Sequence, residues 1–229
     1  MTNTSDIPIY ADKLNSHLER PWIAGLRDRI RLTTTPPDGL YLDASNERLQ
    51  LVSPQYRQPF QLELPRPRPQ ETENLLRACG PAQNVLDAFA GFGQDGLLLA
   101  GRYDVVMVES HPWVYLLLNE LLHCHAYDLV LHLGDAMEHM RDHAGLYDVI
   151  YLDPMFPERT KKALPNRGMQ HLRELSGNGS GPTVEAIVAQ ALNAARHRVV
   201  LKRRVKDPVI GSPNHQIKGK TVRFDVYLA

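Results

Sequence analysis

The chain has 229 residues, of which 43% are hydrophobic, so it can bury the core of one main domain with a modest appendage. Its net charge of zero conceals a division: residues 1–158 hold 12 Lys and Arg against 22 Asp and Glu, whereas residues 159–229 hold 14 against 4. No run approaches the roughly 18 apolar residues of a membrane helix, and residues 1–6 have no signal-peptide character, so we expect a soluble cytoplasmic protein that does not bind membranes.

The first 69 residues are expected to form a small β-rich N-terminal lobe. Short β-like runs at residues 40–42 and 48–52 are joined by a turn-like segment at 43–47. The alternating prolines of residues 65–69 cannot sustain a helix or a central strand, because proline lacks an N–H donor and restricts the residue before it. We therefore place a boundary there, with the main domain at residues 70–229.

Beyond the boundary, apolar strand-like runs alternate with helical ones. Strands are expected at residues 84–89, 104–109, 129–133, 147–152, 198–202 and 221–228, and helices at 94–100, 113–122, 136–140 and 183–195. This alternation predicts an α/β fold, a doubly wound domain in which helices cover both faces of a parallel sheet. Ligands of such domains bind beyond the carboxyl ends of the strands, so the residues that follow each strand are the site candidates.

The first strand of the main domain is followed by the glycine-rich loop DAFAGFGQDG at residues 87–96. Its glycines, beginning with Gly91 and Gly93, have the spacing GxGxxG, which allows a tight turn close to a ligand but also fits a plain strand-to-helix connection. Asp87 ends the strand, and Asp95 stands at the helix start, where it would repel a pyrophosphate. This environment favours S-adenosylmethionine (SAM), with Asp87 against its methionine part, over NAD.

Carboxylates also follow the next two strands. Glu109 ends the second strand, where it could accept hydrogen bonds from both ribose hydroxyls of the cofactor, and Ser110 comes next. Asp135 follows the third strand and could accept a hydrogen bond from the adenine amine, while the small Ala136 leaves room for the ring. Asp135 could equally cap the following helix, and that role is compatible with binding.

The segment DPMFP, residues 153–157, comes directly after the fourth strand. An exocyclic base amine is a poor nucleophile because its lone pair is delocalised into the ring. Hydrogen bonds from the amine to the Asp153 carboxylate and the Pro154 carbonyl would make the lone pair available, and Phe156 could stack on the base. The alternative is a proline-rich turn that only ends the strand. We take these three residues as the catalytic candidates.

Two basic clusters would lie at the same edge of the sheet as the cofactor loop. The candidates for binding RNA phosphates around a flipped base are Arg159, Lys161, Lys162, Lys202 and Arg203. Each cluster alone could be solvated loop charge. Cys124 lies between His123 and His125, but consecutive helical residues point in different directions, and the two cysteines form no CxxC pair. We therefore expect neither a metal site nor a disulfide framework.

With these residues assembled, the chain from residue 84 onward resembles the RsmJ (YhiQ)-type bacterial methyltransferases. The resemblance rests on the segments AGFGQDG, VESHP, YLDPMFP, KKAL, VVLKR and KGKTVRFDVY, of which DPMFP is the most specific. The resemblance implies a Rossmann-like class I SAM-dependent methyltransferase fold. It also implies an enzyme that methylates guanine N2 in 16S rRNA, with the rRNA or the small ribosomal subunit as partner. It also implies that the residues lining the SAM site are Gln94, Asp95, Glu109, Ser110, Asp135, Ala136 and Asp153. Phe89, Phe92 and Gln94 stand where the family more often has Thr, Leu and Arg.

We expect direct transfer of the methyl group, because no cysteine follows the fourth strand to act as a nucleophile. Three alternatives remain at this point. The substrate could be an exocyclic amine of another RNA or DNA base, since the amine-binding turn suits several. The glycine loop could serve an NAD-dependent oxidoreductase, or the chain could be a non-catalytic RNA-binding module, which would have no need for DPMFP beside a cofactor loop.

Overall fold

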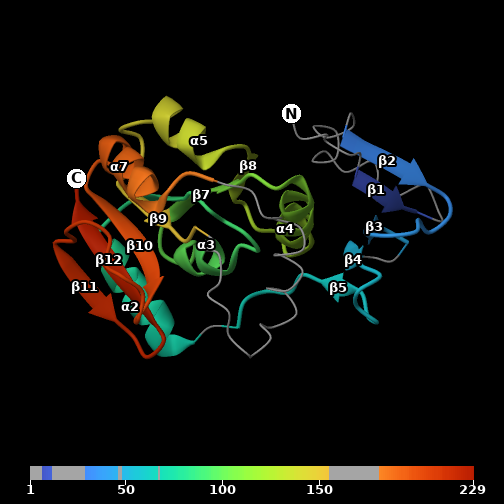
Figure 1. The fold of residues 1–229 in the computed structure, drawn as a ribbon, viewed down its shortest axis with the longest axis horizontal. Coiled ribbons are helices and arrows are strands. Elements are labelled where there is room, and N and C mark those ends of the chain that lie inside the picture. The colour runs from blue at the N-terminus through green and yellow to red at the C-terminus, as the bar shows by residue number, and fades with distance from the viewer. Residues whose placement is uncertain (1–6, 12–28, 46–47, 67, 155–180) are drawn as a thin grey trace.

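The computed structural model describes residues 7–11, 29–45, 48–66, 68–154 and 181–229. Within these residues, strands from the N-terminal part form a small sheet, and later strands form a larger one (Figure 1). Helices pack on both faces of the larger sheet, so the α/β class predicted from the sequence is confirmed.

The small sheet has the strand order β2-β1-β3-β4-β5. Its strands are β1 (Ile7–Tyr10), β2 (Ile30–Thr33), β3 (Tyr41–Asp43), β4 (Gln50–Val52) and β5 (Phe60–Gln61). β1 pairs in parallel with β2 and β3, whereas β3, β4 and β5 are antiparallel. The runs expected at 40–42 and 48–52 correspond to β3 and β4. After β3 the chain turns, with the backbone N–H and hydroxyl of Ser45 donating to Asp43 Oδ1.

The larger sheet has the order β11-β12-β10-β9-β6-β7-β8. Its strands are β6 (Asn84–Asp87), β7 (Asp104–Glu109), β8 (Val130–Leu133), β9 (Val149–Leu152), β10 (Arg198–Arg204), β11 (His215–Lys218) and β12 (Val222–Leu228). The five strands from β8 to β10 are parallel, but β12 is antiparallel to β10 and to β11. The parallel sheet is therefore confirmed except at the β11–β12 hairpin, whose short connection cannot join parallel strands.

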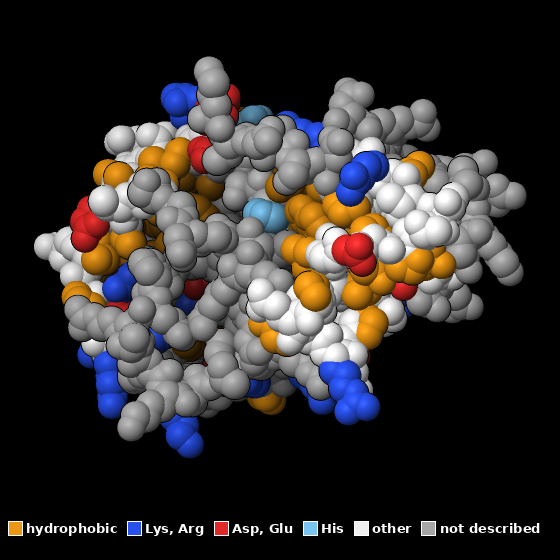
Figure 2. Space-filling view, turned by 45° about the vertical axis from the view of Figure 1, so that its right-hand side comes forward, with side chains coloured by type: hydrophobic (Ala, Val, Ile, Leu, Met, Phe, Trp, Pro, Cys, Tyr) orange, Lys and Arg blue, Asp and Glu red, His pale blue; other side chains and the backbone are white. Residues whose placement is uncertain are grey.

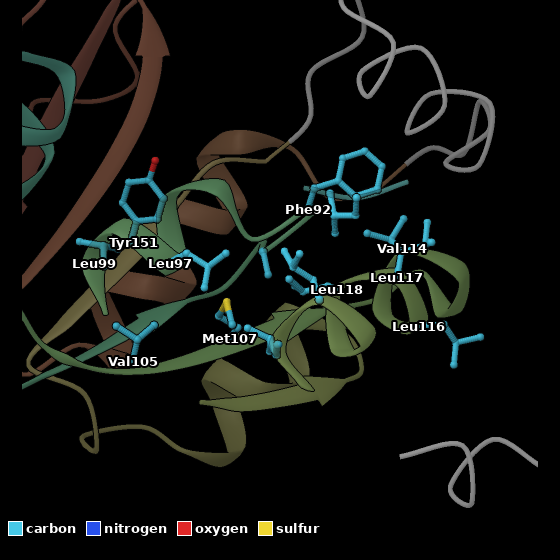
Figure 3. Close-up of a cluster of buried hydrophobic side chains, with 14 of the residues drawn as sticks. Phe92, Leu97, Leu99, Val105, Met107, Val114, Leu116, Leu117, Leu118 and Tyr151 are labelled. Atoms are coloured by element: carbon cyan, nitrogen blue, oxygen red, sulfur yellow. The ribbon is translucent and has the colours of Figure 1, made fainter. Parts of the chain in front are cut away.

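Each face of the larger sheet has its own helices and hydrophobic cluster. α2 (Pro69–Cys79), α3 (Gln94–Leu99) and α4 (Pro112–Cys124) cover one face, and α5 (Ala136–Asp142) and α7 (Val184–Ala194) cover the other. Figure 3 shows part of the first cluster, where Phe92 lies on the side of Val114 and Leu117 from α4. α2 was missed in the sequence, although it begins where the proline run ends: Pro69 occupies its first turn, which needs no N–H donor.

The first cluster also includes buried residues of the small sheet, among them Ile7, Leu42 and Leu51. The two sheets therefore share one hydrophobic cluster instead of each having a separate core. The strands of the small sheet lie between Ile7 and Gln61, and the helices and strands of the larger layer begin with α2 at Pro69. A division into two domains at residue 69 stays a prediction.

The strand order reverses between β6 and β9. The chain leaves β6 for β7 on one side, while β9 is followed by β10 on the other side. In open α/β sheets the crevice at such a switch point, outside the carboxyl ends of the strands, is the usual ligand position. Asp87 ends β6 and Asp153 directly follows β9, so the fold brings these two carboxylates to that point.

Candidate active site

The glycine loop turns sharply between β6 and α3. Gly91 and Gly93 have positive φ angles of 54° and 71°, which residues other than glycine rarely adopt. A Cβ atom on Gly93 would lie 2.5 Å from Cδ1 of Leu118 on α4. Gln94 then begins α3. The backbone of Gly93 thus lies against the Leu118 side chain of α4, where a side chain on the loop would not fit. The tight turn that the glycine spacing predicts is present.

Gly96 brings α3 into close contact with the strands beneath it. A Cβ atom there would lie 2.6 Å from Sδ of Met107 and 2.8 Å from Oδ2 of Asp87. The third glycine of the motif is therefore required for packing. It allows the helix to lie directly over the Asp87 carboxylate at the end of β6.

Asp87 is a buried carboxylate with an unsatisfied oxygen. The residue is 1% exposed, and Oδ1 accepts no hydrogen bond from any residue that the structure describes. Burial raises the pKa of Asp87 well above its usual range, and the nearby carboxylates of Asp95 and Asp153 raise it further. A buried acceptor without a partner needs an explanation, and a cationic ligand group that donates to it would supply one.

Glu109, at the end of β7, binds the backbone of the glycine loop and of the turn that precedes α4. Oε2 accepts from the N–H of Gly91 at 2.8 Å, and Oε1 accepts from the N–H of His111 at 2.6 Å. Burial raises the pKa of Glu109 to about 7, although these backbone hydrogen bonds act against the rise. Each carboxylate oxygen can accept a second hydrogen bond, so Glu109 keeps acceptor capacity beside the exposed Ser110.

Asp135 caps α5, one of the two roles expected for it. Its Oδ1 accepts from the backbone N–H groups of Met137 at 2.8 Å and Glu138 at 3.0 Å. The residue is exposed, and the small neighbouring Ala136 is buried. Because the cap uses Oδ1, the other oxygen of Asp135 can accept from a ligand.

A lysine joins the carboxylates at the switch point. Nζ of Lys202, on β10, lies 2.5 Å from Oδ2 of Asp95 and 3.0 Å from Oδ2 of Asp153. The hydroxyl of Tyr151, on β9, also donates to Oδ2 of Asp95 at 2.5 Å. In Figure 3 the Tyr151 hydroxyl points away from the hydrophobic side chains around Leu97 and Leu99. Sequence reasoning missed both contacts, which join α3, β9 and β10.

The structure gives Lys202 and Arg203 partners other than the RNA phosphates expected for them. Lys202 binds Asp95 and Asp153, and Arg203 is only 8% exposed, with Nε 3.8 Å from Oδ2 of Asp207. The two residues point to opposite faces of β10, as alternation along a strand requires. The other predicted residues Phe156, Arg159, Lys161 and Lys162 lie outside the described residues.

Basic side chains are nevertheless exposed at the end of β10 and just after it. Arg204 and Lys206 are both exposed. Figure 2 shows Lys and Arg side chains along the lower edge of one face of the molecule. In the described part of the chain, no three His, Cys, Asp or Glu residues are arranged to hold a metal ion. Among the same residues, no helix is both long and apolar enough to span a membrane.

Comparison with known proteins identifies the family. A family model for SAM-dependent methyltransferases, SAM_MT, matches residues 26–229. A protein of Legionella pneumophila called ribosomal RNA small subunit methyltransferase J is 38% identical over 168 residues, which are 69% of this chain and 68% of that protein. The protein with the same name in Thioalkalivibrio sulfidiphilus is 41% identical over 177 residues, 69% of this chain and 68% of the relative. The chain belongs to the ribosomal RNA small subunit methyltransferase J family.

A solved structure supports the family assignment. The crystal structure of a SAM-dependent methyltransferase from Neisseria gonorrhoeae matches with a TM-score of 0.68 and 25% identity, covering 96% of each chain. Membership in this family confirms the Rossmann-like class I fold and the use of SAM as methyl donor. The protein is a SAM-dependent methyltransferase, and the NAD-dependent alternative is excluded.

Proposed function

We propose that the protein transfers the methyl group of SAM to the exocyclic N2 amine of a guanine in 16S rRNA, in the cytoplasm, with the rRNA or the small ribosomal subunit as its partner. The observation that carries the proposal is the position of Asp153. Its side chain is 39% exposed, and it follows β9 at the switch point beside Asp87 and Asp95. Curated relatives named as small-subunit rRNA methyltransferases support the choice of RNA.

The residues around the switch point fit SAM. The unsatisfied Oδ1 of Asp87 would accept from the positively charged amino group of the methionine part. The remaining acceptor capacity of Glu109 would serve the ribose hydroxyls, and Asp135 and Ala136 would receive the adenine. The backbone of the glycine loop, with Gly91, Gly93 and Gln94 beside Asp95, would enclose the methionine part. The exposed Ser110 is the remaining residue that we expect to line the SAM site.

Asp153 and Pro154 would prepare the nucleophile. SAM supplies a methyl group on a positively charged sulfur, which makes that methyl electrophilic. The bond from Lys202 uses Oδ2 of Asp153, so Oδ1 is the oxygen that would accept from the guanine amine, with the Pro154 carbonyl as second acceptor. The amine releases one proton on methylation, and the Asp153 carboxylate can accept it. Phe156, from the same motif, would stack on the flipped base.

The proposal is tested with Asp153→Asn and Asp153→Ala on rRNA from cells that lack the protein. Single-turnover methyl transfer at saturating SAM should fall by about 100-fold or more in Asp153→Ala, since general-base and orienting groups contribute factors of about 10²–10⁴. SAM affinity, measured by calorimetry, should fall much less than the rate. The exposed carboxylate of Asp104 supplies a matched control, Asp104→Asn, whose rate should equal that of the wild type.

Mass spectrometry of the nucleosides formed decides the substrate. N2-methylguanosine in 16S rRNA is expected from the wild-type protein. Methylated adenine, or methylation only of another RNA or of DNA, would show that the turn serves a different exocyclic amine. Near-normal turnover by a folded Asp153→Ala protein would show that Asp153 does not orient the amine and that DPMFP is only a structural turn.

A further inference from the structure

We infer that Lys202 is a positioning residue of the methyl-transfer site, whose ammonium group holds Asp95 and Asp153 together so that Asp153 can receive the base amine, and that it does not contact RNA phosphates. The inference rests on the proposed function of Asp153. It assigns Lys202 a role that differs from the phosphate contact expected from the sequence.

The geometry of the ammonium group supports this role. Nζ of Lys202 lies within hydrogen-bond distance of Oδ2 of Asp95 and Oδ2 of Asp153, and its side chain is only 23% exposed. The paired register of Leu201 with Leu152 places Lys202 on β10 beside Asp153, which follows β9. A lysine that has both carboxylates as partners has little capacity left for a phosphate, because an ammonium group carries only three donors.

The charges that surround Asp153 in the described part of the chain come from three elements. Asp87 at the end of β6 and Asp95 on α3 interact unfavourably with a negative charge on Asp153, and Lys202 on β10 opposes them. Tyr151 on β9 is neutral, because burial and the nearby carboxylates raise its pKa well above the usual range. Burial raises the pKa of Asp153, the ammonium of Lys202 counteracts part of that rise, and Asp95 adds to it. Burial would lower the pKa of Lys202, but Asp153 and Asp95 together raise it, so the lysine remains charged.

Removal of the lysine charge should therefore have a defined consequence. Without the lysine charge, the carboxylates of Asp95 and Asp153 would repel each other, and protonation of Asp153 would relieve the repulsion. When Asp153 is protonated, its carboxyl group is no longer a negatively charged acceptor and cannot take the proton of the amine. Methyl transfer by such a variant should be impaired at neutral pH and should recover as the pH rises.

The bond to Asp95 extends the role of Lys202 to the cofactor loop. Oδ2 of Asp95 accepts from the Tyr151 hydroxyl and from Lys202, so the carboxylate at the start of α3 is held by β9 and β10 together. Asp95 is 17% exposed and stands beside the glycine loop. Lys202 thus joins the loop proposed to enclose the donor with the turn proposed to orient the acceptor, and loss of the lysine should affect the alignment of the two substrates more than the binding of either.

The test compares wild-type protein with Lys202→Met, Lys202→Arg and the matched control Lys218→Met, which replaces an exposed lysine on β11. The titration of the Asp153 carboxyl carbon is followed by ¹³C NMR in the SAM-free protein, with Asp153→Asn used to assign its signal. Lys202→Met should move the Asp153 titration upward by at least one pH unit, whereas Lys202→Arg and Lys218→Met should leave it within about half a unit. If Lys202→Met does not fold, Lys202→Gln replaces it, since glutamine keeps the length and one donor group without the charge.

Activity and RNA binding then separate positioning from phosphate contact. In Lys202→Met the acidic limb of the single-turnover pH profile should shift upward by the same interval as the NMR titration, the rate at pH 7 should fall at least tenfold, and Lys202→Arg should restore most of it. The salt dependence of RNA binding should remain that of the wild type. If the Asp153 titration does not shift in Lys202→Met, the inference is overturned. It is also overturned if the pH profile of Lys202→Met is unshifted while the salt dependence of its RNA binding falls by the amount expected for one phosphate contact.

The same experiments distinguish failure of the proposed function from failure of the inference. If the wild-type protein does not methylate rRNA but the Asp153 titration shifts in Lys202→Met, the proposed substrate is wrong and the electrostatic role of Lys202 stands. If the wild-type protein methylates guanine N2 but the titration is unchanged, the proposed function stands and the inference is overturned.

Discussion

The ring of Phe60 lies 5.2 Å from the ring of Phe92, with an angle of 36° between their planes. Phe60 belongs to β5 of the small sheet, and Phe92 stands between the two positive-φ glycines of the glycine loop. Phe92 is buried in the cluster that also contains Val114 and Leu117 of α4. The small sheet therefore helps to hold the loop in its turn.

Phe60→Ala should loosen the glycine loop. The aromatic pair contributes about 0.5–1.5 kcal/mol beyond burial, so the free energy of unfolding should fall by about 1–3 kcal/mol, less than for a fully buried Phe. SAM affinity should fall severalfold, because binding must then also order the loop. Chemical denaturation and calorimetry measure the two effects. Leu32→Ala, at an exposed position of the same sheet, should change neither quantity; equal losses in both variants would contradict a specific link through Phe60.

SAM affinity should increase as the pH rises from 6 to 8. Burial places the pKa of Glu109 near 7, so the carboxyl is largely protonated at pH 6, and ribose hydroxyls bind better to the ionised form. Binding near neutral pH should therefore release protons, which calorimetry in buffers of different ionisation enthalpy detects. Glu109→Gln should weaken binding by about 1.5–3 kcal/mol at pH 8 and flatten the pH profile.

The control for that profile is Glu138→Gln, which removes an exposed glutamate of α5. This variant should keep the pH dependence of the wild type. If Glu109→Gln also keeps it, the proton is released from another group, and Asp87 becomes the candidate because its pKa is also raised by burial.

Gly96→Ala should destabilise the protein although alanine is the better helix former. The added methyl group would lie 2.6 Å from Sδ of Met107 and 2.8 Å from Oδ2 of Asp87, and overpacking of this kind costs about 1–3 kcal/mol, against about 1 kcal/mol gained in helix propensity. SAM affinity should also fall, because the Asp87 carboxylate must move. Thermal unfolding and calorimetry measure both. Gly101→Ala meets only an ordinary contact at 3.4 Å and should be tolerated; similar behaviour of the two variants would show that α3 shifts freely.

The exposed basic residues at the end of β10 and just after it should contribute to RNA binding. Arg204 and Lys206 are exposed on the segment that leaves the site, and Arg223 holds this segment through hydrogen bonds to the carbonyls of Arg204, Val205, Asp207 and Pro208. Replacement of Arg204 and Lys206 by Gln should reduce the slope of log affinity against log salt by about 1.4–1.8, the value for two phosphate contacts. The double variant of Lys218 and Lys220 controls for net charge. An equal decrease of the salt slope in both double variants would mean that RNA affinity depends only on the overall charge of the protein.

The strands and helices of the larger sheet were mostly predictable, because each depends on a local apolar pattern. The strand expected at 104–109 is β7, and the helix expected at 113–122 lies within α4. The strands β1, β2, β5 and β11 have only two to four residues each, too few to show a pattern, and they form because neighbouring strands supply hydrogen-bond partners.

The candidate site was predictable where its residues follow directly from a motif. Asp87, Glu109, Asp135 and Asp153 all lie at or just after the strand ends, because apolar strands of a doubly wound sheet end at one edge. The sequence alone therefore determined the family, and it placed the glycine loop and these carboxylates at one edge of the sheet. Tertiary structure decided the partners of Lys202 and Arg203, which are adjacent in a basic run and look alike in the sequence. The register of β10 against β9 and β12 sends one side chain to Asp95 and Asp153 and buries the other on the opposite face, and no local pattern encodes that register.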